Sequence, residues 1–333
     1  MDNAKELASI TPKKREQLHV SGINMLNDCG LRFYFRYVLG IRRPPAAYMH
    51  IGTAVDESVA RDLENKINTG ELLKRDDAIG IAAAKFEERQ SSDPIELEPD
   101  DKGLSIEDVI GASKDKTVAL AGLHYDKAAP TIQPKHVQRK FAINMDKWMR
   151  DRAKKMHDDA DMEPNKYLAT QLHSEARALN ATARLGLDLA GEQDIVELAG
   201  EQLVVRDTKT TGKSPIPTAA VDSDQLTIYA LASLVLDKKI PDFVGLDFLI
   251  YTPKRHDTKY VYLNSTRTME DLEVGLYRFS NAIHAYRRGV FVPAKADWYG
   301  CSQKYCGYFD RCPAAKRPKL VQITQEYQGG ETK

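Results

Sequence analysis

The sequence lacks the features that mark membrane, secreted and strongly charged proteins. Its 333 residues contain no run of 18 apolar residues, and the stretch from Met1 to Gln17 is polar and charged. We therefore expect no membrane span and no secretory signal, and a cytoplasmic location. Lysine plus arginine equals aspartate plus glutamate, at 48 each. This balance excludes a global basic field, so any nucleic acid would have to be held by a local basic groove.

Cysteine is scarce and unevenly placed. Cys29 stands alone, whereas Cys301, Cys306 and Cys312 crowd together. In a cytosolic chain, clustered cysteines are more typical of metal binding than of disulfides. Four thiolates suit a 4Fe–4S cluster or Zn²⁺. The spacing differs from the paired Cys-x-x-Cys knuckles of a zinc ribbon.

A complete phosphate-binding loop is also missing. Thr211-Gly212-Lys213-Ser214 resembles the end of one, but the first glycine of that motif would fall on Asp207. The sequence therefore gives no indication of an ATPase.

Hydrophobic periodicity indicates an α/β fold, with helices before and after a central group of strands. Residues 70–125 give helical patterns broken by an acidic loop over 91–102. We expect a polar segment over 1–20, a single domain over 21–315 with a helical insertion at about 70–165, and a polar tail over 316–333. Predicted helices cover 21–40, 49–67, 136–158, 222–236 and 269–288, and predicted strands cover 172–189, 244–251 and 259–263.

The most informative segment is a predicted β-hairpin. Two apolar runs flank Gly200-Glu201, which predicts a two-residue turn of the II′ type. With Ala199 facing Gln202, counting outward places Asp194 opposite Asp207, with Cβ atoms roughly 5 Å apart. Two such carboxylates repel each other, and a divalent cation between them removes the repulsion.

Three more polar residues extend this pattern. Lys209 lies two residues beyond Asp207 and so shares its face of the strand. Gln225 and Tyr229 share one face of the helix that follows. Two acids and a lysine at one end of a hairpin indicate a metal-dependent phosphodiesterase, and the alternative is a merely solvated charged surface.

Together these residues resemble the RecB-type branch of the PD-(D/E)XK nucleases. They are most similar to its iron–sulfur members, such as the AddB nuclease domain and the CRISPR-associated spacer-acquisition exonucleases. The matching motifs are Ser21-x7-Cys29 with the aromatic segment Arg32 to Tyr37, Ile51 to Glu57, Gly191-x-x-Asp194, Asp207-x-Lys209, Gln225-x3-Tyr229 and Cys301-x4-Cys306-x5-Cys312-Pro313.

The resemblance implies a restriction-endonuclease-like core, with a central mixed β-sheet flanked by helices and a helical N-terminal elaboration. It implies a 4Fe–4S clasp through Cys29, Cys301, Cys306 and Cys312 that joins the two ends, with Zn²⁺ as the alternative. Four residues separate the first pair of the C-terminal cysteines, where the family commonly has two.

The resemblance also implies a catalytic metal, Mg²⁺ or Mn²⁺, held by Asp194, Asp207, the carbonyl of Thr208 and Asp56. The family usually has histidine at the position of Asp56. Glu175, expected on a preceding strand, is a possible outer-shell ligand, and a salt bridge is its alternative role.

The implied function is a DNA nuclease, an exonuclease favouring single-stranded ends, in recombination, repair or phage DNA processing. In such an enzyme Lys209 orients the attacking water, and Gln225 and Tyr229 position the strand. Basic residues such as Arg206, Lys213 and Arg32 would contact phosphates. The source would be prokaryotic or phage, and a helicase or recombination protein is a possible partner. The alternative is a catalytically silent DNA-binding subunit of a repair complex.

Overall fold

A mixed β-sheet forms the centre of the computed structural model, which describes residues 16–98, 101, 103–252, 257–295 and 297–315. The six strands that these residues form run in the order β1-β3-β4-β5-β6, with β2 paired to β3. The pairs β1–β3 and β4–β5 are parallel and the others antiparallel. The strands are β1 (Glu16–His19), β2 (Pro134–Asn144), β3 (Leu187–Ala199), β4 (Gln202–Thr211), β5 (Phe243–Thr252) and β6 (Asp257–Ser265). The predicted α/β class and mixed sheet are confirmed.

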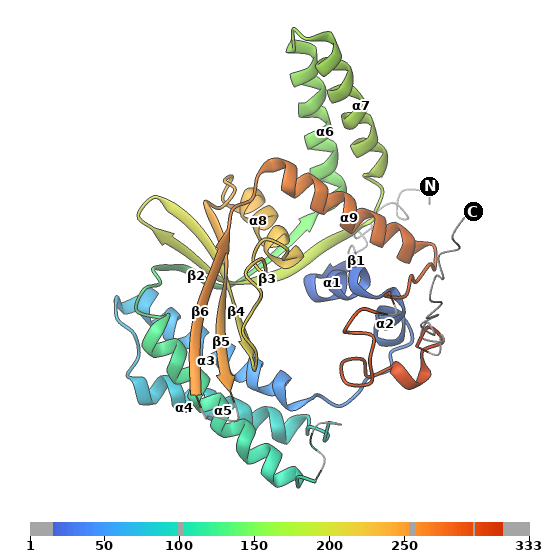
Figure 1. Ribbon diagram of the computed structural model, residues 1–333. Coiled ribbons are helices and arrows are strands. Elements are labelled where there is room, and N and C mark those ends of the chain that lie inside the picture. The colour runs from blue at the N-terminus through green and yellow to red at the C-terminus, as the bar shows by residue number, and fades with distance from the viewer. Residues whose placement is uncertain (1–15, 99–100, 102, 253–256, 296, 316–333) are drawn as a thin grey trace, which may run out of the picture.

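Helices cover both faces of this sheet, and one helical pair projects from it (Figure 1). One face carries α3 (Ala47–Thr69), α4 (Arg75–Ser92) and α5 (Ile106–Lys127). The other carries α1 (Val20–Asp28), α8 (Asp224–Leu236) and α9 (Met269–Arg287). The projecting hairpin consists of α6 (Met145–Met162) and α7 (Lys166–Thr182).

Two hydrophobic cores lie on the two faces of the sheet. Ile195 belongs to the core beneath α3 and α5, whereas its neighbour Val196 belongs to the core beneath α8 and α9. This separation follows from the alternation of side chains along a strand. Neighbouring residues in the paired part of β3 and β4 therefore enter different environments.

Several predicted elements are confirmed, because their caps and periodicity agree. The helices expected over 49–67, 222–236 and 269–288 correspond to α3, α8 and α9, and the later strands to β5 and β6. The Ser223 side chain caps α8 by accepting from the Leu226 N–H, and Thr268 forms a capping box with Asp271 at the start of α9. Such caps satisfy backbone donors that have no partner within the helix.

Two predicted elements are wrong. The single helix expected over 136–158 is instead strand β2 followed by α6, and Asn144 caps that helix through the Lys147 N–H. The predicted helical insertion therefore contains a strand. The strands expected over 172–189 are mostly α7, whose buried Ala176 and Leu179 have helical spacing. In both places, tertiary packing overrides the local pattern.

The helix expected over 21–40 breaks at Cys29, whose backbone is extended with φ of −160°. Helix α2 (Gly30–Phe33) and a π-helical turn follow it. The Gly30 N–H donates to the Val292 carbonyl at 2.7 Å, and a Cβ on Gly30 would lie 2.6 Å from the Val292 nitrogen. Only glycine permits this approach. The break therefore brings Cys29 beside the segment that leads to the other cysteines.

The segments predicted at the ends of the chain fall largely outside the described residues. Residues 1–15 of the polar N-terminal segment and the tail over 316–333 are not described, and Glu16 to His19 form β1. The single-domain boundary stays a prediction. No helix in the described part of the chain has both the length and the apolar character needed to cross a bilayer.

Candidate active site

The hairpin of β3 and β4 has the predicted register. Ala199 pairs with Gln202, and the ladder runs to the pair of Ile195 and Arg206. Gly200 has a φ of +64°, as the first position of a II′ turn requires. Asp194 and Asp207 are the next residues beyond this last pair, and Asp194 Oδ2 accepts the Thr208 N–H at 3.2 Å.

Asp207 is the centre of a polar network. It is 1% exposed, and its Oδ2 forms a 2.6 Å ion pair with Lys209 Nζ. Gln225 Nε2, on α8, donates to Asp207 Oδ1 at 2.7 Å and to the Tyr229 hydroxyl at 2.8 Å. Gln225 Oε1 accepts from Lys209 Nζ at 3.0 Å. One glutamine thus fixes the orientation of all three partners.

Asp56 brings a third carboxylate to this network from α3. Burial, then the charge of Asp207, raises the pKa of Asp56 to about 7, while Lys209 lowers it. Burial and the charges of Asp207 and Asp56 raise the pKa of Asp194 well above its ordinary value. Burial lowers the pKa of Lys209, but the charges of Asp207 and Asp194 outweigh burial and raise it. Three acids therefore share one lysine, and negative charge is in excess.

The donor set fits a hard divalent cation, which prefers oxygen ligands. The raised pKa values of Asp56 and Asp194 show that a nearby positive charge would stabilise both carboxylates. The side chains do not form a closed ligand sphere, since no three His, Cys, Asp or Glu residues of the described chain group closely enough to hold a metal ion. Lys209 instead neutralises Asp207 in this arrangement.

Comparison with protein families agrees with this geometry. The model of the PD-(D/E)XK nuclease superfamily matches residues 17–313. The chain belongs to the PD-(D/E)XK nuclease superfamily. Membership implies a nuclease, and nucleases of this superfamily generally use a divalent metal such as Mg²⁺ or Mn²⁺.

Other comparisons add little. No curated protein matches the chain. A solved structure described as "Crystal structure of SSO0001" is 15% identical, and the alignment covers 52% of this chain and 83% of that one. Its TM-score of 0.25 is too low to carry an argument.

The candidate site contains a positioning residue that the sequence did not indicate. Gln193, next to Asp194 in β3, is fully buried. Its Nε2 donates to the Tyr229 carbonyl at 2.8 Å and to the Ser233 hydroxyl at 2.9 Å. These bonds tie α8 to the sheet and so place Gln225 above Asp207. A single glutamine in a strand carries no recognisable sequence signal.

Other expected site residues lie elsewhere. Glu175 is on the exposed side of helix α7, so the strand expected for it is wrong, and its outer-shell role stays a prediction. Arg206 is 5% exposed and ion-paired with Glu197 and Asp247, so it cannot bind a DNA backbone. Lys213 is exposed beyond the end of β4.

The four cysteines share one small pocket. Cys29, Cys301, Cys306 and Cys312 all line it, and none forms a disulfide. The Ala294 N–H donates to Cys29 Sγ at 3.4 Å. Burial raises the pKa of the Cys306 thiol, and the neighbouring Arg32 lowers it. The thiols converge, but no three of them group closely enough for a single metal ion among the described residues.

Proposed function

We propose that this chain is a Mg²⁺- or Mn²⁺-dependent deoxyribonuclease of the RecB-like branch, an exonuclease that favours single-stranded ends in recombination, repair or phage DNA processing. The observation that supports it is the network in which Asp207 contacts both Lys209 and Gln225, with Asp194 and Asp56 beside it. Asp194, Asp207, Asp56 and the Thr208 carbonyl would hold the metal. The bound metal would lower the pKa of water and neutralise the phosphate.

Each side chain of the network has a distinct role in this proposal. The raised pKa keeps Lys209 protonated, so it donates to the attacking water or to a phosphoryl oxygen. Burial, with the charges of Asp194 and Asp207, raises the pKa of Tyr229. Tyr229 therefore stays a neutral hydroxyl, and it keeps Gln225 turned towards Asp207. The site thus presents ordered donors where charge develops on the phosphate.

The direct test is digestion of end-labelled single- and double-stranded DNA in Mg²⁺ or Mn²⁺, with EDTA as the blank. We expect metal-dependent release of labelled product, faster from single-stranded ends. Asp207→Asn should lose this activity, whereas Glu201→Gln, an exposed change at the tip of the same hairpin, should retain it. DNA binding without digestion in either metal would contradict the proposal and favour a silent DNA-binding subunit.

We also propose that the four cysteines hold a 4Fe–4S cluster that clasps the two ends of the domain. Supporting this are the pocket that the four thiols share and their spacing in the sequence, which differs from the paired Cys-x-x-Cys knuckles of a zinc ribbon. An N–H to sulfur hydrogen bond, such as that of Ala294, tunes such clusters.

Cys306→Ser should remove the brown visible absorbance and lower the unfolding midpoint by roughly 5 °C or more, because the clasp is lost. Ser302→Ala, a change in the same segment, is the control and should do neither. Absorbance spectra, iron and zinc analysis and thermal unfolding of anaerobic protein check this. Colourless wild-type protein with one zinc per chain would contradict the assignment.

A further inference from the structure

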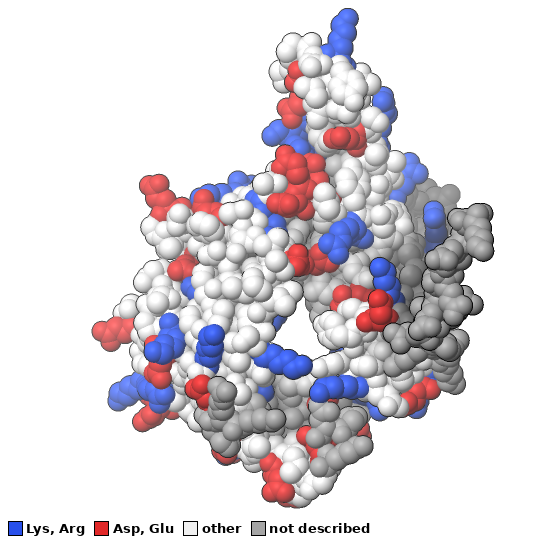
Figure 2. Space-filling view, viewed as in Figure 1, with Lys and Arg blue, Asp and Glu red and all other residues white. Residues whose placement is uncertain are grey.

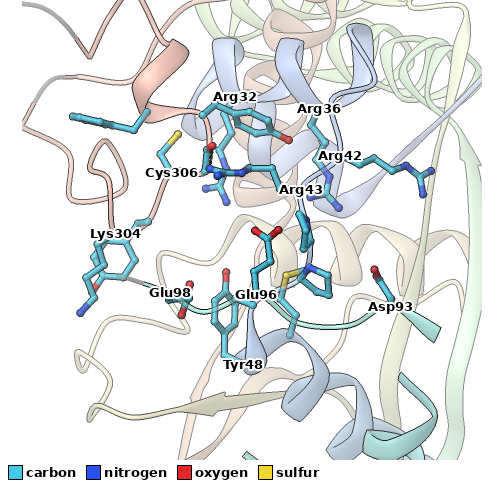
Figure 3. Close-up of a pocket in the computed structure, with 18 of the residues that line it drawn as sticks. Arg32, Arg36, Arg42, Arg43, Tyr48, Asp93, Glu96, Glu98, Lys304 and Cys306 are labelled. Atoms are coloured by element: carbon cyan, nitrogen blue, oxygen red, sulfur yellow. Dashed lines mark hydrogen bonds between the residues drawn. The ribbon is translucent and has the colours of Figure 1, made fainter. Parts of the chain in front are cut away.

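A second polar pocket, separate from the catalytic aspartates, lies between α3 and the cysteine segment (Figure 3). It has a volume of about 880 Å³. Three stretches far apart in the sequence line it: Arg32 to Thr53, Arg89 to Glu98, and Gln303 to Asp310. Figure 2 shows positive and negative side chains interspersed over the visible face of the molecule. Because the chain has no net charge, its binding of nucleic acid would depend on a local pocket of this kind.

One wall of this pocket is basic. Arg36, Arg42 and Arg43 line the same side in Figure 3. Arg43 donates to the Gly307 carbonyl, so it holds the wall together. Arg36 and Arg42 are exposed and have no ion-pair partner among the described residues. These two guanidinium groups are available for phosphate.

The opposite wall is acidic. Asp93, Glu96 and Glu98 lie across from the arginines, and the Glu96 carboxylate points towards them (Figure 3). The backbone fixes this wall, because the His50 ring nitrogen bonds to the Asp93 carbonyl at 2.7 Å, and the Glu96 N–H donates to the Pro45 carbonyl at 3.4 Å. Arg89 also lines this wall and pairs with Asp93 at 3.7 Å, so Glu96 supplies the negative charge that faces the arginines.

Helix α3 connects this pocket to the catalytic centre. Tyr48, in its first turn, lines the pocket and is 58% exposed. Asp56 lies eight residues further along the same helix, about 12 Å by the helical rise. Between them, Gly52 lies against Thr210 of β4, just beyond Lys209. A strand lying in the pocket can thus reach the catalytic aspartates along one side of α3.

We propose that this pocket binds one strand of the nucleic acid and excludes a second. Arg36 and Arg42 bind its phosphates, Tyr48 stacks on a base, and the Glu96 carboxylate on the opposite wall repels the other backbone of a duplex. Stacking on an exposed aromatic ring beside a basic groove is the usual basis of single-strand binding. Two antiparallel phosphate backbones would place one of them against the carboxylates, which costs affinity. The inference rests on the proposed nuclease function, but its test does not require cleavage.

The test is equilibrium binding of a fluorescent single-stranded oligonucleotide and of its blunt duplex, in EDTA and over a range of salt. Wild-type protein should bind the single strand more tightly. Arg36→Ala with Arg42→Ala should weaken single-strand binding about tenfold and reduce the slope of log affinity against log salt by about 1.4, or 0.7 for each phosphate contact. Arg177→Ala, on the exposed side of α7, is the matched control.

The acidic wall is tested by charge removal. Glu96→Gln should raise duplex affinity about threefold relative to single-strand affinity, because one repulsive charge is gone. Glu201→Gln, at the distant hairpin tip, should leave that ratio unchanged. Because the Glu96 side chain is exposed, we expect the Glu96→Gln variant to fold. If the double arginine variant does not fold, the single substitution Arg42→Gln replaces it in the binding measurements.

An unchanged salt slope in the arginine variant, or an unchanged duplex-to-single-strand ratio in Glu96→Gln, would overturn the proposal. The result is separable from the nuclease assignment. Selective binding with no metal-dependent digestion would overturn only the nuclease function. Digestion with unchanged binding in both sets of variants would overturn only the pocket.

Discussion

Arg206 and Asp207 are neighbours in β4, but their side chains enter opposite faces of the sheet and meet different electrostatic surroundings. Arg206 Nε and Nη2 donate to both oxygens of Asp247 at 2.9 and 2.8 Å, and Nη1 donates to Glu197 at 3.1 Å. The guanidinium also lies 4.2 Å from the centre of the Tyr262 ring. This network is closed, because each of its charged groups has partners within the protein.

On the Asp207 face, three carboxylates share a single lysine. Asp56 has no hydrogen-bond donor among the described residues, and burial with the charge of Asp207 raises its pKa. Lys209 is 41% exposed while its partner is buried, so the network opens to solvent. Burial of charge therefore does not by itself distinguish a catalytic site. The Asp207 face differs from the Arg206 face by its excess of negative charge beside an opening to solvent.

The largest expected effect is the loss of activity in Lys209→Ala. We expect metal-dependent digestion to fall roughly a thousandfold, because a donor to the reacting groups is removed. DNA binding, the cysteine-site absorbance and the circular dichroism spectrum should stay as in wild type. Lys155→Ala, an exposed change on α6, controls for the loss of one positive charge. Wild-type rates in Lys209→Ala would contradict the catalytic role of this face.

A substitution on the Arg206 face should change the stability of the protein rather than its activity. Arg206→Met leaves Asp247 and Glu197 without their counter-charge, and we expect the free energy of unfolding to fall by about 3 kcal/mol. Urea unfolding measures this, with the exposed Arg177→Met as control. The digestion rate per folded molecule should change little. If Arg206→Met were as stable as the wild type but had lost activity, the roles assigned to the two faces would be contradicted.

A smaller effect concerns His124, which is buried on the Arg206 side. Burial lowers its pKa to about 4, the charge of Asp247 raises it and that of Arg206 lowers it. Between pH 6.5 and pH 4, His124 binds a proton in the unfolded chain but not in the folded protein. The free energy of unfolding is therefore highest above pH 6.5 and decreases as the pH falls through this range. Between pH 7.5 and 5 this loss should be about 2 kcal/mol. His124→Leu should be less sensitive to pH by that amount in urea unfolding, and an equal sensitivity would show that the histidine titrates normally.

The sequence predicted which side chains meet on the Asp207 face, because their meeting depends on local rules. The turn at Gly200 sets the register of the hairpin, whose ladder ends at Ile195 and Arg206, the neighbours of Asp194 and Asp207. Helical spacing then puts Gln225 and Tyr229 on one side of α8. The superfamily match confirms the fold class and a nuclease, while the roles of the individual residues stay predictions.

The parts that were missed depend on long-range packing. β2 has no clear alternation of apolar and polar residues, and it forms a strand because β3 offers a free edge. The arginine and glutamate walls of the second pocket come from two segments far apart in the chain, and the cysteine segment adds a third stretch of lining. Arg206 looked like a DNA contact because sequence position does not reveal which face of a sheet holds its counter-charges.

The most direct test compares Mn²⁺ binding by two buried aspartates on opposite faces. Isothermal titration of wild-type protein should show Mn²⁺ binding that Asp207→Asn abolishes and that Asp247→Asn preserves, with circular dichroism confirming that each variant is folded. If Asp247→Asn does not fold, wild type against Asp207→Asn still decides the question. Mn²⁺ binding that survives Asp207→Asn would contradict the account, because the divalent metal would then lie elsewhere in the molecule.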